Sequence, residues 1–251
     1  MNFVTFSRKG IKTKVNEDGY FVPQWDGFQF VQDVEKKGYL FVVCDGMGGH
    51  KAGNVASYYC SKWIFKEFYD ETDHQIKDWF EEKITQINNR IYKLSEDNFK
   101  YRGMGTTLVT LLIKDNYVYI SNVGDSRVYQ YSENNLKQIT EDHSIVWEYY
   151  DKGLITKDDI IKRHDKNIIT QAIGTSEKPK INFYKMKLPE KYIYMLCTDG
   201  LTDVLIDKKI EEAFKNQKRL HQIKNTLYDL SQINNSYDDV TIVIVSNYLK
   251  R

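Results

Sequence analysis

The sequence has few of the features that mark secreted, membrane-bound or multidomain proteins. Only 3 of its 251 residues are proline and 3 are cysteine, and no Gly/Ser linker or low-complexity tract interrupts the chain. No apolar run approaches the ~20 residues that a membrane-spanning helix needs, and Met1–Lys14 is polar and basic where a secretory signal would be apolar. We therefore expect a cytoplasmic protein in which Cys44, Cys60 and Cys197 are buried thiols.

An excess of charge of either sign is also lacking. The 36 Lys and Arg residues nearly balance the 35 Asp and Glu residues, which leaves a net charge of +1. Bulk electrostatics therefore give no reason to expect binding to nucleic acid or to a membrane. A zinc site is disfavoured because the five histidines show no paired spacing. We expect one continuous domain over residues 1–251, present as a monomer, although two small domains also fit this length.

The hydrophobic pattern changes several times between the period of strands and that of helices. It predicts strands at Gly19–Val22, Gly27–Gln32, Tyr39–Cys44, Thr107–Ile113, Tyr117–Val123, Arg127–Tyr131, Ile181–Met186, Tyr192–Thr198 and Val240–Ser246. It predicts helices at about Ala52–Tyr69, Ile76–Leu94, Ser144–Lys152, Lys157–Arg163, Asp207–Lys215 and Leu220–Ile233. Hairpin strands with helices grouped between them indicate an α+β fold with antiparallel sheets.

Several acidic residues lie beside these predicted strands. Two apolar strands are followed by Asp-Gly, at Asp45-Gly46 and at Asp199-Gly200, and we expect both strands to end there so that the sheet holds each carboxylate rigidly. The other acidic sites are Glu17-Asp18, Asp125 and Asp238-Asp239. Any single Asp-Gly is more often an ordinary turn, so the functional interpretation depends on the whole set.

A set of carboxylates with few His or Cys residues is what Mg²⁺ and Mn²⁺ require, because these hard cations prefer oxygen ligands. Two such ions bridged by one carboxylate share a hydroxide nucleophile and neutralise a phosphoryl oxygen. Other catalytic motifs are absent from the sequence. The glycine-rich stretch from Gly46 to Gly53 matches neither a P-loop nor a dinucleotide-binding turn, and no Ser or Cys nucleophile elbow is present.

Eight short motifs, in order along nearly the whole chain, resemble those of the PPM family of metal-dependent Ser/Thr protein phosphatases, the type 2C phosphatases, in their bacterial style. They are Gly10…Asn16-Glu17-Asp18, Asp45-Gly-Met-Gly-Gly-His50, Gly103-Met-Gly-Thr-Thr107, Asn122-Val-Gly-Asp-Ser-Arg127, Glu141-Asp-His-Ser144, Thr170-Gln-Ala-Ile-Gly174, Cys197-Thr-Asp-Gly200 and Asp238-Asp-Val-Thr241. The resemblance implies a four-layer α-β-β-α sandwich with two central antiparallel sheets flanked by helix pairs.

The resemblance also implies a role for each acidic site. Asp45 matches the carboxylate that bridges two metal ions, with the Gly46 carbonyl as a further ligand. Asp199 and Asp238 match ligands of the first ion, and Glu17 or Asp18 serves the second, partly through water. Asp125, Asp199 and Asp203 match a weaker third metal position, while Asp239 stands where Asn is usual. The implied cofactors are two Mn²⁺ or Mg²⁺ ions, with a third bound more weakly.

The implied reaction is hydrolysis of phosphoserine and phosphothreonine in proteins, the targets of a Ser/Thr kinase. A metal-activated water attacks directly, without a phosphoenzyme. Two residues depart from the family pattern. Thr13 replaces an arginine that commonly grips the substrate phosphate, so we expect Lys12 or Lys14 to bind the phosphate more weakly, unless both are plain surface lysines. Met47 replaces a histidine proposed as general acid in some members, which leaves His50 as a candidate acid or as a structural residue of the turn.

The segment Ile155–Lys180 matches the variable flap beside the family's active site. We expect it to influence substrate choice, although a plain solvated loop would have the same composition. Two other functions remain open. The first is a catalytically weak relative that binds or senses phosphoproteins, which the loss of arginine at Thr13 suggests. The second is a metal-dependent nuclease, which the near-neutral charge does not support.

Overall fold

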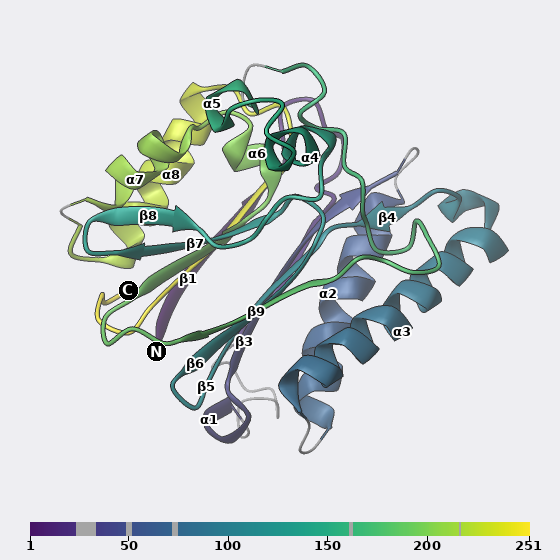
Figure 1. The fold of residues 1–251 in the computed structure, drawn as a ribbon, viewed down its shortest axis with the longest axis horizontal. Coiled ribbons are helices and arrows are strands. Elements are labelled where there is room, and N and C mark those ends of the chain that lie inside the picture. The colour runs from purple at the N-terminus through teal and green to yellow at the C-terminus, as the bar shows by residue number, and fades with distance from the viewer. Residues whose placement is uncertain (24–33, 49–51, 72–74, 161–162, 216) are drawn as a thin grey trace. The chain divides into compact units, whose positions relative to one another are not determined.

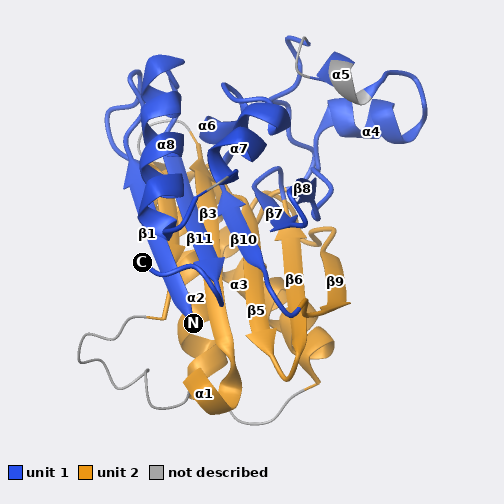
Figure 2. Ribbon diagram, turned by 90° about the vertical axis from the view of Figure 1, so that its left-hand side faces the viewer, with its two compact units in different colours: residues 1–16, 124–171, 190–251 blue, residues 17–123, 172–189 orange. Residues whose placement is uncertain are grey.

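Two antiparallel β-sheets with associated helices make up the structure, which is a computed structural model (Figure 1). It describes residues 1–23, 34–48, 52–71, 75–160, 163–215 and 217–251. The residues divide into two units, each of which takes in separate stretches of the chain (Figure 2). Unit 1 contains residues 1–16, 124–171 and 190–251, and unit 2 contains residues 17–123 and 172–189. The expectation of one continuous domain stays a prediction.

The sheet of unit 2 has the strand order β2-β3-β5-β6-β9, with β4 paired to β3. The bounds are β2 Asp18–Phe21, β3 Tyr39–Met47, β4 Gly105–Thr106, β5 Leu108–Lys114, β6 Tyr117–Val123 and β9 Asn182–Lys187. Asp115 and Asn116 connect β5 to β6 with φ values of 49° and 63°. Two consecutive residues with positive φ form the tight hairpin turn that suits twisted strands, and Asp and Asn tolerate this conformation.

Two long helices, α2 (Gly53–Asp70) and α3 (Ile76–Asp97), pack on one face of this sheet, and α1 (Val34–Lys37) and the short 3₁₀ helix η2 (Phe99–Tyr101) complete the unit. Alternate residues of β3, namely Leu40, Val42 and Cys44, share a buried cluster with Ile64 of α2 and Ile84 of α3. A fully buried aliphatic side chain of this size contributes about 1.5–3 kcal/mol to stability. The even-numbered residues of β3 therefore face the helices, and the odd-numbered ones face the other way.

The sheet of unit 1 has the strand order β1-β11-β10-β7-β8. Its strands are β1 Asn2–Arg8, β7 Arg127–Ser132, β8 Asn135–Gln138, β10 Ile193–Cys197 and β11 Val240–Ser246, and its helices are α4 Ile145–Asp151, α5 Lys157–Ile160, α6 Asp199–Thr202, α7 Asp207–Phe214 and α8 Leu220–Ile233. All seven residues of β11 are buried. Apolar side chains of α7 and α8, such as Ile210, Ile223 and Leu227, share a core cluster with β11.

The sequence predicted the fold class and most elements correctly. It missed β1, β8 and the short elements α1, β4, α6 and η2. Helix α5, Lys157–Ile160, lies within the predicted helix Lys157–Arg163, of which residues 161 and 162 are not described. The predicted strand Gly27–Gln32 lies outside the described residues. The three cysteines are fully buried, as expected. None of the helices in the described part of the chain is both long and apolar enough to span a membrane.

Candidate metal and phosphate site

In unit 2, the acidic residues Asp18 and Asp45 lie directly opposite each other on neighbouring strands. Asp18 is the first residue of β2, and the antiparallel register pairs it with Asp45 of β3. Opposite residues of an antiparallel pair project from the same face, with Cβ atoms about 4.5–5.5 Å apart. Because Cys44 faces the helices, Asp45 and Asp18 project from the opposite face of the sheet. The fold therefore brings the carboxylates of two separate sequence motifs, Asn16-Glu17-Asp18 and Asp45–His50, next to each other.

The backbone of Asp45 is held by hydrogen bonds on both sides. Its N–H donates to the hydroxyl of Thr107 over 2.8 Å, and its carbonyl accepts from the Thr107 N–H and the Thr106 hydroxyl. The prediction that the strand ends at Cys44 is wrong, because β3 continues through Asp45 to Met47. The reason is the pairing of Gly46 and Met47 with β4, a contact between distant segments.

Gly46 is required by the close approach of other backbone segments. A Cβ atom on Gly46 would lie 2.2 Å from the carbonyl oxygen of Gly53 and 2.5 Å from that of Glu17. The Gly46 N–H donates to the Glu17 carbonyl over 3.1 Å. The start of α2 and the segment before β2 therefore both pack against this glycine, which fixes the Glu17-Asp18 pair relative to Asp45.

In unit 1, Asp125 and Asp199 lie close enough to affect each other's charge. Asp199 begins α6 directly after β10, and Asp125 lies in the loop between β6 and β7. Burial raises the pKa of Asp125 well above its ordinary range, and the charges of Asp199 and Asp142 raise it further, while Arg127 opposes the shift. Two carboxylates placed in this way repel each other when both are ionised, and a bound cation would relieve that repulsion.

Asp238 and Asp203 are a second pair of interacting acids in unit 1. Burial raises the pKa of Asp238, and the charges of Asp239 and Asp203 add to the shift, although the Asp239 N–H donates to the Asp238 carboxylate over 2.8 Å. The carboxylate of Asp203 accepts from Lys166 Nζ at 3.0 Å and from Asn167 Nδ2 at 2.6 Å. Asp203, predicted as a ligand of a third metal ion, is thus engaged by two residues of the flap.

The loop after β1 contains the predicted phosphate-binding residues. The ammonium nitrogen of Lys12 lies 3.9 Å from the centroid of the Tyr237 ring, a cation–π contact one residue before Asp238. The hydroxyl of Thr13 donates to Asp239 Oδ1 over 2.5 Å, and the N–H of Gly10 donates to the same oxygen over 2.8 Å. Lys14 is exposed. Met47 ends β3, and His50 lies outside the described residues.

Comparisons with known proteins agree with this arrangement. The profile of the protein phosphatase 2C family matches residues 23–237. The chain belongs to this family. The serine/threonine phosphatase stp of Listeria welshimeri is 32% identical over 214 residues, which cover 84% of this chain and 85% of the Listeria protein. The protein phosphatase PhpP of Streptococcus pneumoniae is 32% identical over 82% of this chain and 85% of its own length.

Solved structures of related phosphatases have the same fold. The structure of the serine/threonine phosphatase Stp1 from Staphylococcus aureus aligns with a TM-score of 0.86 and 32% identity, covering 96% of this chain and 93% of that one. The catalytic domain of the phosphatase PstP in complex with two manganese ions aligns with a TM-score of 0.81 and 27% identity, covering 99% and 98% of the two chains. The α+β fold with two antiparallel sheets that the sequence predicts is thereby confirmed for this phosphatase.

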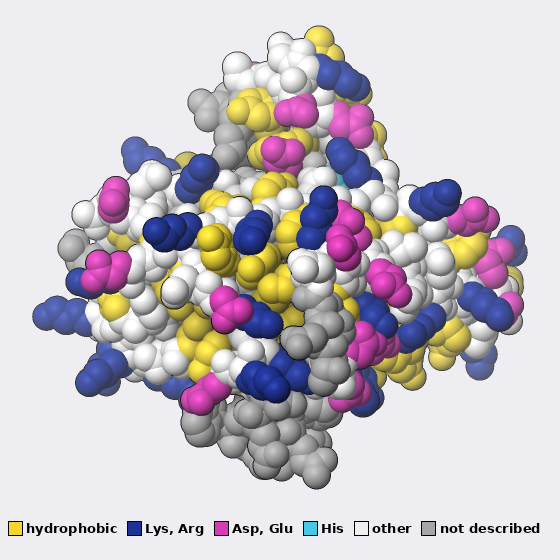
Figure 3. Space-filling model, turned by 60° about the horizontal axis from the view of Figure 1, so that its bottom comes forward, with side chains coloured by type: hydrophobic (Ala, Val, Ile, Leu, Met, Phe, Trp, Pro, Cys, Tyr) yellow, Lys and Arg dark blue, Asp and Glu magenta, His cyan; other side chains and the backbone are white. Residues whose placement is uncertain are grey.

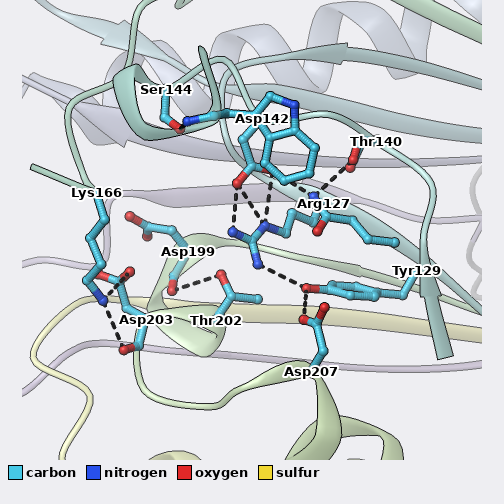
Figure 4. A network of polar contacts seen from close by, with 12 residues as sticks. Arg127, Tyr129, Thr140, Asp142, Ser144, Lys166, Asp199, Thr202, Asp203 and Asp207 are labelled. Atoms are coloured by element: carbon cyan, nitrogen blue, oxygen red, sulfur yellow. Dashed lines mark hydrogen bonds and ion pairs between the residues drawn. The ribbon is translucent and has the colours of Figure 1, made fainter. Parts of the chain in front are cut away.

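The phosphatase also contains a buried polar network that sequence reasoning did not find (Figure 4). Arg127 forms a forked ion pair with Asp142, with nitrogen–oxygen distances of 3.0, 3.0 and 2.6 Å. It also donates to the hydroxyl of Tyr129, which in turn donates to Asp207 over 2.9 Å. The motifs Asn122–Arg127 and Glu141–Ser144 quoted above contain two of these residues. Nothing in the spacing of the two motifs indicates that they meet.

Within the described residues, no three acidic, histidine or cysteine side chains gather closely enough to form a metal site by themselves. The structure instead places the predicted ligands as pairs, Asp18 with Asp45 in unit 2 and Asp125 with Asp199 in unit 1. The donors are all carboxylate oxygens, which is the chemistry that Mg²⁺ and Mn²⁺ prefer. The residues therefore fit hard divalent cations better than zinc.

Proposed function

We propose that this phosphatase hydrolyses phosphoserine and phosphothreonine in proteins with the help of two Mn²⁺ or Mg²⁺ ions. The observation that carries the proposal is the pairing of Asp18 and Asp45 on adjacent strands of a protein phosphatase 2C chain. The residues of unit 2 that would hold these ions are Asp45, the carbonyl of Gly46 and Glu17 or Asp18. Asp199 and Asp238 would supply ligands from unit 1, and Asp125 would serve a weaker third position.

When bound, two such cations generate hydroxide near neutral pH and neutralise the charge on the phosphoryl oxygens. The contribution of the chain is to hold the carboxylates in place without rearrangement. Thr106 and Thr107 fix the backbone of Asp45, and the β2–β3 register fixes Asp18 beside it. No nucleophilic side chain is needed, because a water molecule attacks the phosphorus directly in line with the leaving Ser or Thr oxygen.

For binding of the substrate phosphate, we propose Lys12 rather than Thr13. The Thr13 hydroxyl is used by Asp239, whereas the Lys12 ammonium is held over Tyr237, next in sequence to Asp238. A lysine attracts phosphate as a point charge and lacks the two-pronged contact of arginine, so binding would be weaker than with arginine. Protonation of the leaving oxygen is assigned to water, with His50 as the alternative acid.

We further propose that the substrates are cytoplasmic targets of a Ser/Thr kinase and that the phosphatase acts as a monomer. A catalytically weak relative that binds phosphoproteins is the second candidate function, and the use of Thr13 by Asp239 is the observation in its favour. A nuclease has no such support. On the face shown in Figure 3, Lys and Arg side chains alternate with Asp and Glu side chains, and the net charge is +1.

The test is hydrolysis of a phosphothreonine peptide and of p-nitrophenyl phosphate during titration with Mn²⁺. We expect no turnover in excess chelator, recovery on addition of Mn²⁺, and a loss of at least about 10²–10³-fold in kcat for Asp45→Asn and Asp199→Asn. The matched control is Asp97→Asn, a change at the exposed end of α3. Full activity in chelator would contradict the proposal, and Mn²⁺-dependent peptide binding without turnover would favour the weak relative.

A further inference from the structure

Unit 1 contains a cavity of about 600 Å³, and most of the residues that line it have no part in the proposed reaction. Asp125 and Asp199 line one part of it, so the cavity is continuous with the place where metal ligands are expected. The remaining wall includes five apolar side chains, from α4, α5 and the turn before α7. They are Val146, Trp147, Ile160, Leu205 and Ile206. We call this cavity the α4–α7 pocket.

The apolar wall of the α4–α7 pocket is fixed by the fold. Val146, Ile160 and Leu205 are buried, with 1%, 6% and 4% of their surface exposed. Helix α4 is held at its start by Ser144, whose hydroxyl accepts from the N–H of Trp147. Ile206, which is 44% exposed, lies at the rim, directly before α7. A ligand that enters the pocket would therefore replace water against a preformed apolar surface.

Three of the acidic groups in the wall already have partners in the same unit. Asp142 is paired with Arg127, Asp207 accepts from the Tyr129 hydroxyl, and Asp203 is paired with Lys166 (Figure 4). At these three acids, an ionic ligand would have to break an existing contact before it gained a partner, and the remaining acids Asp125 and Asp199 are the ones proposed to bind metal ions. The chemistry of the pocket therefore favours an uncharged apolar group.

Two polar atoms of the wall are left without a partner among the described residues, and they complement a peptide group. Trp147 Nε1 is a buried donor and Gln138 Oε1 is a buried acceptor. Buried polar groups of this kind are usually satisfied. A peptide unit has one carbonyl acceptor and one N–H donor, which are the kinds of group that a donor and an acceptor of this type bind. Both atoms are buried, so the indole and the amide would shift slightly to engage a ligand.

We propose that the α4–α7 pocket binds a large aliphatic or aromatic side chain of the phosphoprotein substrate, close in sequence to the phosphorylated residue. This inference rests on the proposed function, because it assigns the pocket to the same substrate. The pocket gives the phosphatase a preference for substrates with a hydrophobic residue beside the phosphothreonine. Side chains of α4 and of the turn before α7 determine this preference.

The test compares phosphothreonine peptides that differ only by Leu, Ala or Glu at one position, scanned over the residues on either side of the phosphothreonine. For the wild type in Mn²⁺, we expect kcat/KM to be about tenfold higher for Leu than for Ala at one position. In Ile206→Lys, that ratio should fall toward one, and the Glu peptide should gain several-fold relative to Ala. Ile233→Lys, the same change at a 74% exposed isoleucine outside the pocket, should keep the wild-type ratios.

A second variant tests the peptide contact. Trp147→Phe keeps an aromatic wall but removes the indole N–H, and we expect it to raise KM for all the peptides while the Leu preference remains. Equal rates for Leu and Ala peptides at every position, or an unchanged ratio in Ile206→Lys, would overturn the pocket assignment. These results are distinct from failure of the proposed function, in which the wild type would hydrolyse none of the peptides in Mn²⁺.

Discussion

The hydroxyl of Thr13 donates a hydrogen bond to Oδ1 of Asp239 over 2.5 Å, although the two residues are 226 positions apart in the chain. Both positions depart from the residues usual in the resembled family, which are arginine and asparagine. Because Thr13 and Asp239 contact each other, the two unusual residues form a single local structure. The Asp239 carboxylate also accepts from the Gly10 N–H, so it fixes the loop that carries Lys12.

The contact between Thr13 and Asp239 should stabilise the folded protein. In a double-mutant cycle with Thr13→Val and Asp239→Ala, we expect a coupling of about 1–2 kcal/mol in the free energy of unfolding, because a hydrogen bond to a buried carboxylate is charge-assisted. Asp239 is only 3% exposed, so water does not replace the hydroxyl easily. Urea denaturation of the four proteins gives the coupling directly. Strictly additive effects would show that the contact does not stabilise the fold.

Restoring an arginine at position 13 should help only when the carboxylate at position 239 is removed. In Thr13→Arg, the guanidinium should pair with Asp239 and leave KM for a phosphopeptide nearly unchanged. In Thr13→Arg/Asp239→Asn, the guanidinium is released, and we expect KM to fall about tenfold through two-pronged phosphate binding. Asp239→Asn alone is the control. An equal drop in KM for the single and double variants would refute the pairing.

The Arg127–Asp142 pair should be costly to break from one side. Arg127→Met removes the cation that is paired with the buried Asp142 carboxylate and should cost about 3–5 kcal/mol of unfolding free energy. Arg127→Met/Asp142→Asn should recover part of that loss, because it also removes the buried charge. Tyr129→Phe should cost about 1–2 kcal/mol, since it removes only the hydroxyl that joins Arg127 to Asp207. Chemical denaturation measures all three, and a harmless Arg127→Met would be the contrary result.

Gly46 should not tolerate even a methyl group. Gly46→Ala would place Cβ 2.2 Å from the Gly53 carbonyl oxygen, and backbone must move to relieve the clash. We expect a loss of about 3 kcal/mol or more in stability, visible as a lower Tm and a lower yield of folded protein. Gly153→Ala is the comparison. It has open space but a φ of 69°, and should cost about 1 kcal/mol. Equal effects of the two substitutions would contradict the steric explanation.

Without metal, the phosphatase should lose stability as the pH rises. The pKa values of Asp125 and Asp238 are raised in the folded protein, mainly by burial. The folded state therefore binds these protons more tightly than the unfolded chain. Their contribution is fully present below the ordinary pKa of 3.8 and is lost as the pH rises through the folded-state values.

This pH dependence can be measured as Tm in chelator at increasing pH. We expect Asp125→Asn to raise the metal-free Tm above pH 7 by about 2–4 °C, equivalent to ~1 kcal/mol, because the amide carries no charge. Addition of Mn²⁺ should stabilise the wild type more than the variant. The exposed Asp97→Asn change should have no effect in either condition. A metal-free Tm that does not change with pH would refute the role of these buried acids.

The sequence determined the features that depend on neighbouring residues. Asp115 and Asn116 tolerate positive φ, so the β5–β6 hairpin could be placed from the chain alone. The spacing of Ile84, Ile87 and Ile91 gave the buried stripe of α3 in the same way. The strand β1 was also readable in principle, because Val4 and Phe6 alternate with more polar residues, although the prediction did not include it.

Only the tertiary structure decided the contacts between distant segments. β3 extends through Asp45 because β4 pairs with Gly46 and Met47, and Asp18 lies opposite Asp45 because β2 joins the same sheet. The partners of Arg127 and Thr13 depend in the same way on which segments pack together. Backbone preferences and hydrophobic periodicity act over a few residues, whereas the partner of a strand or a carboxylate is selected by the burial and pairing of the whole chain.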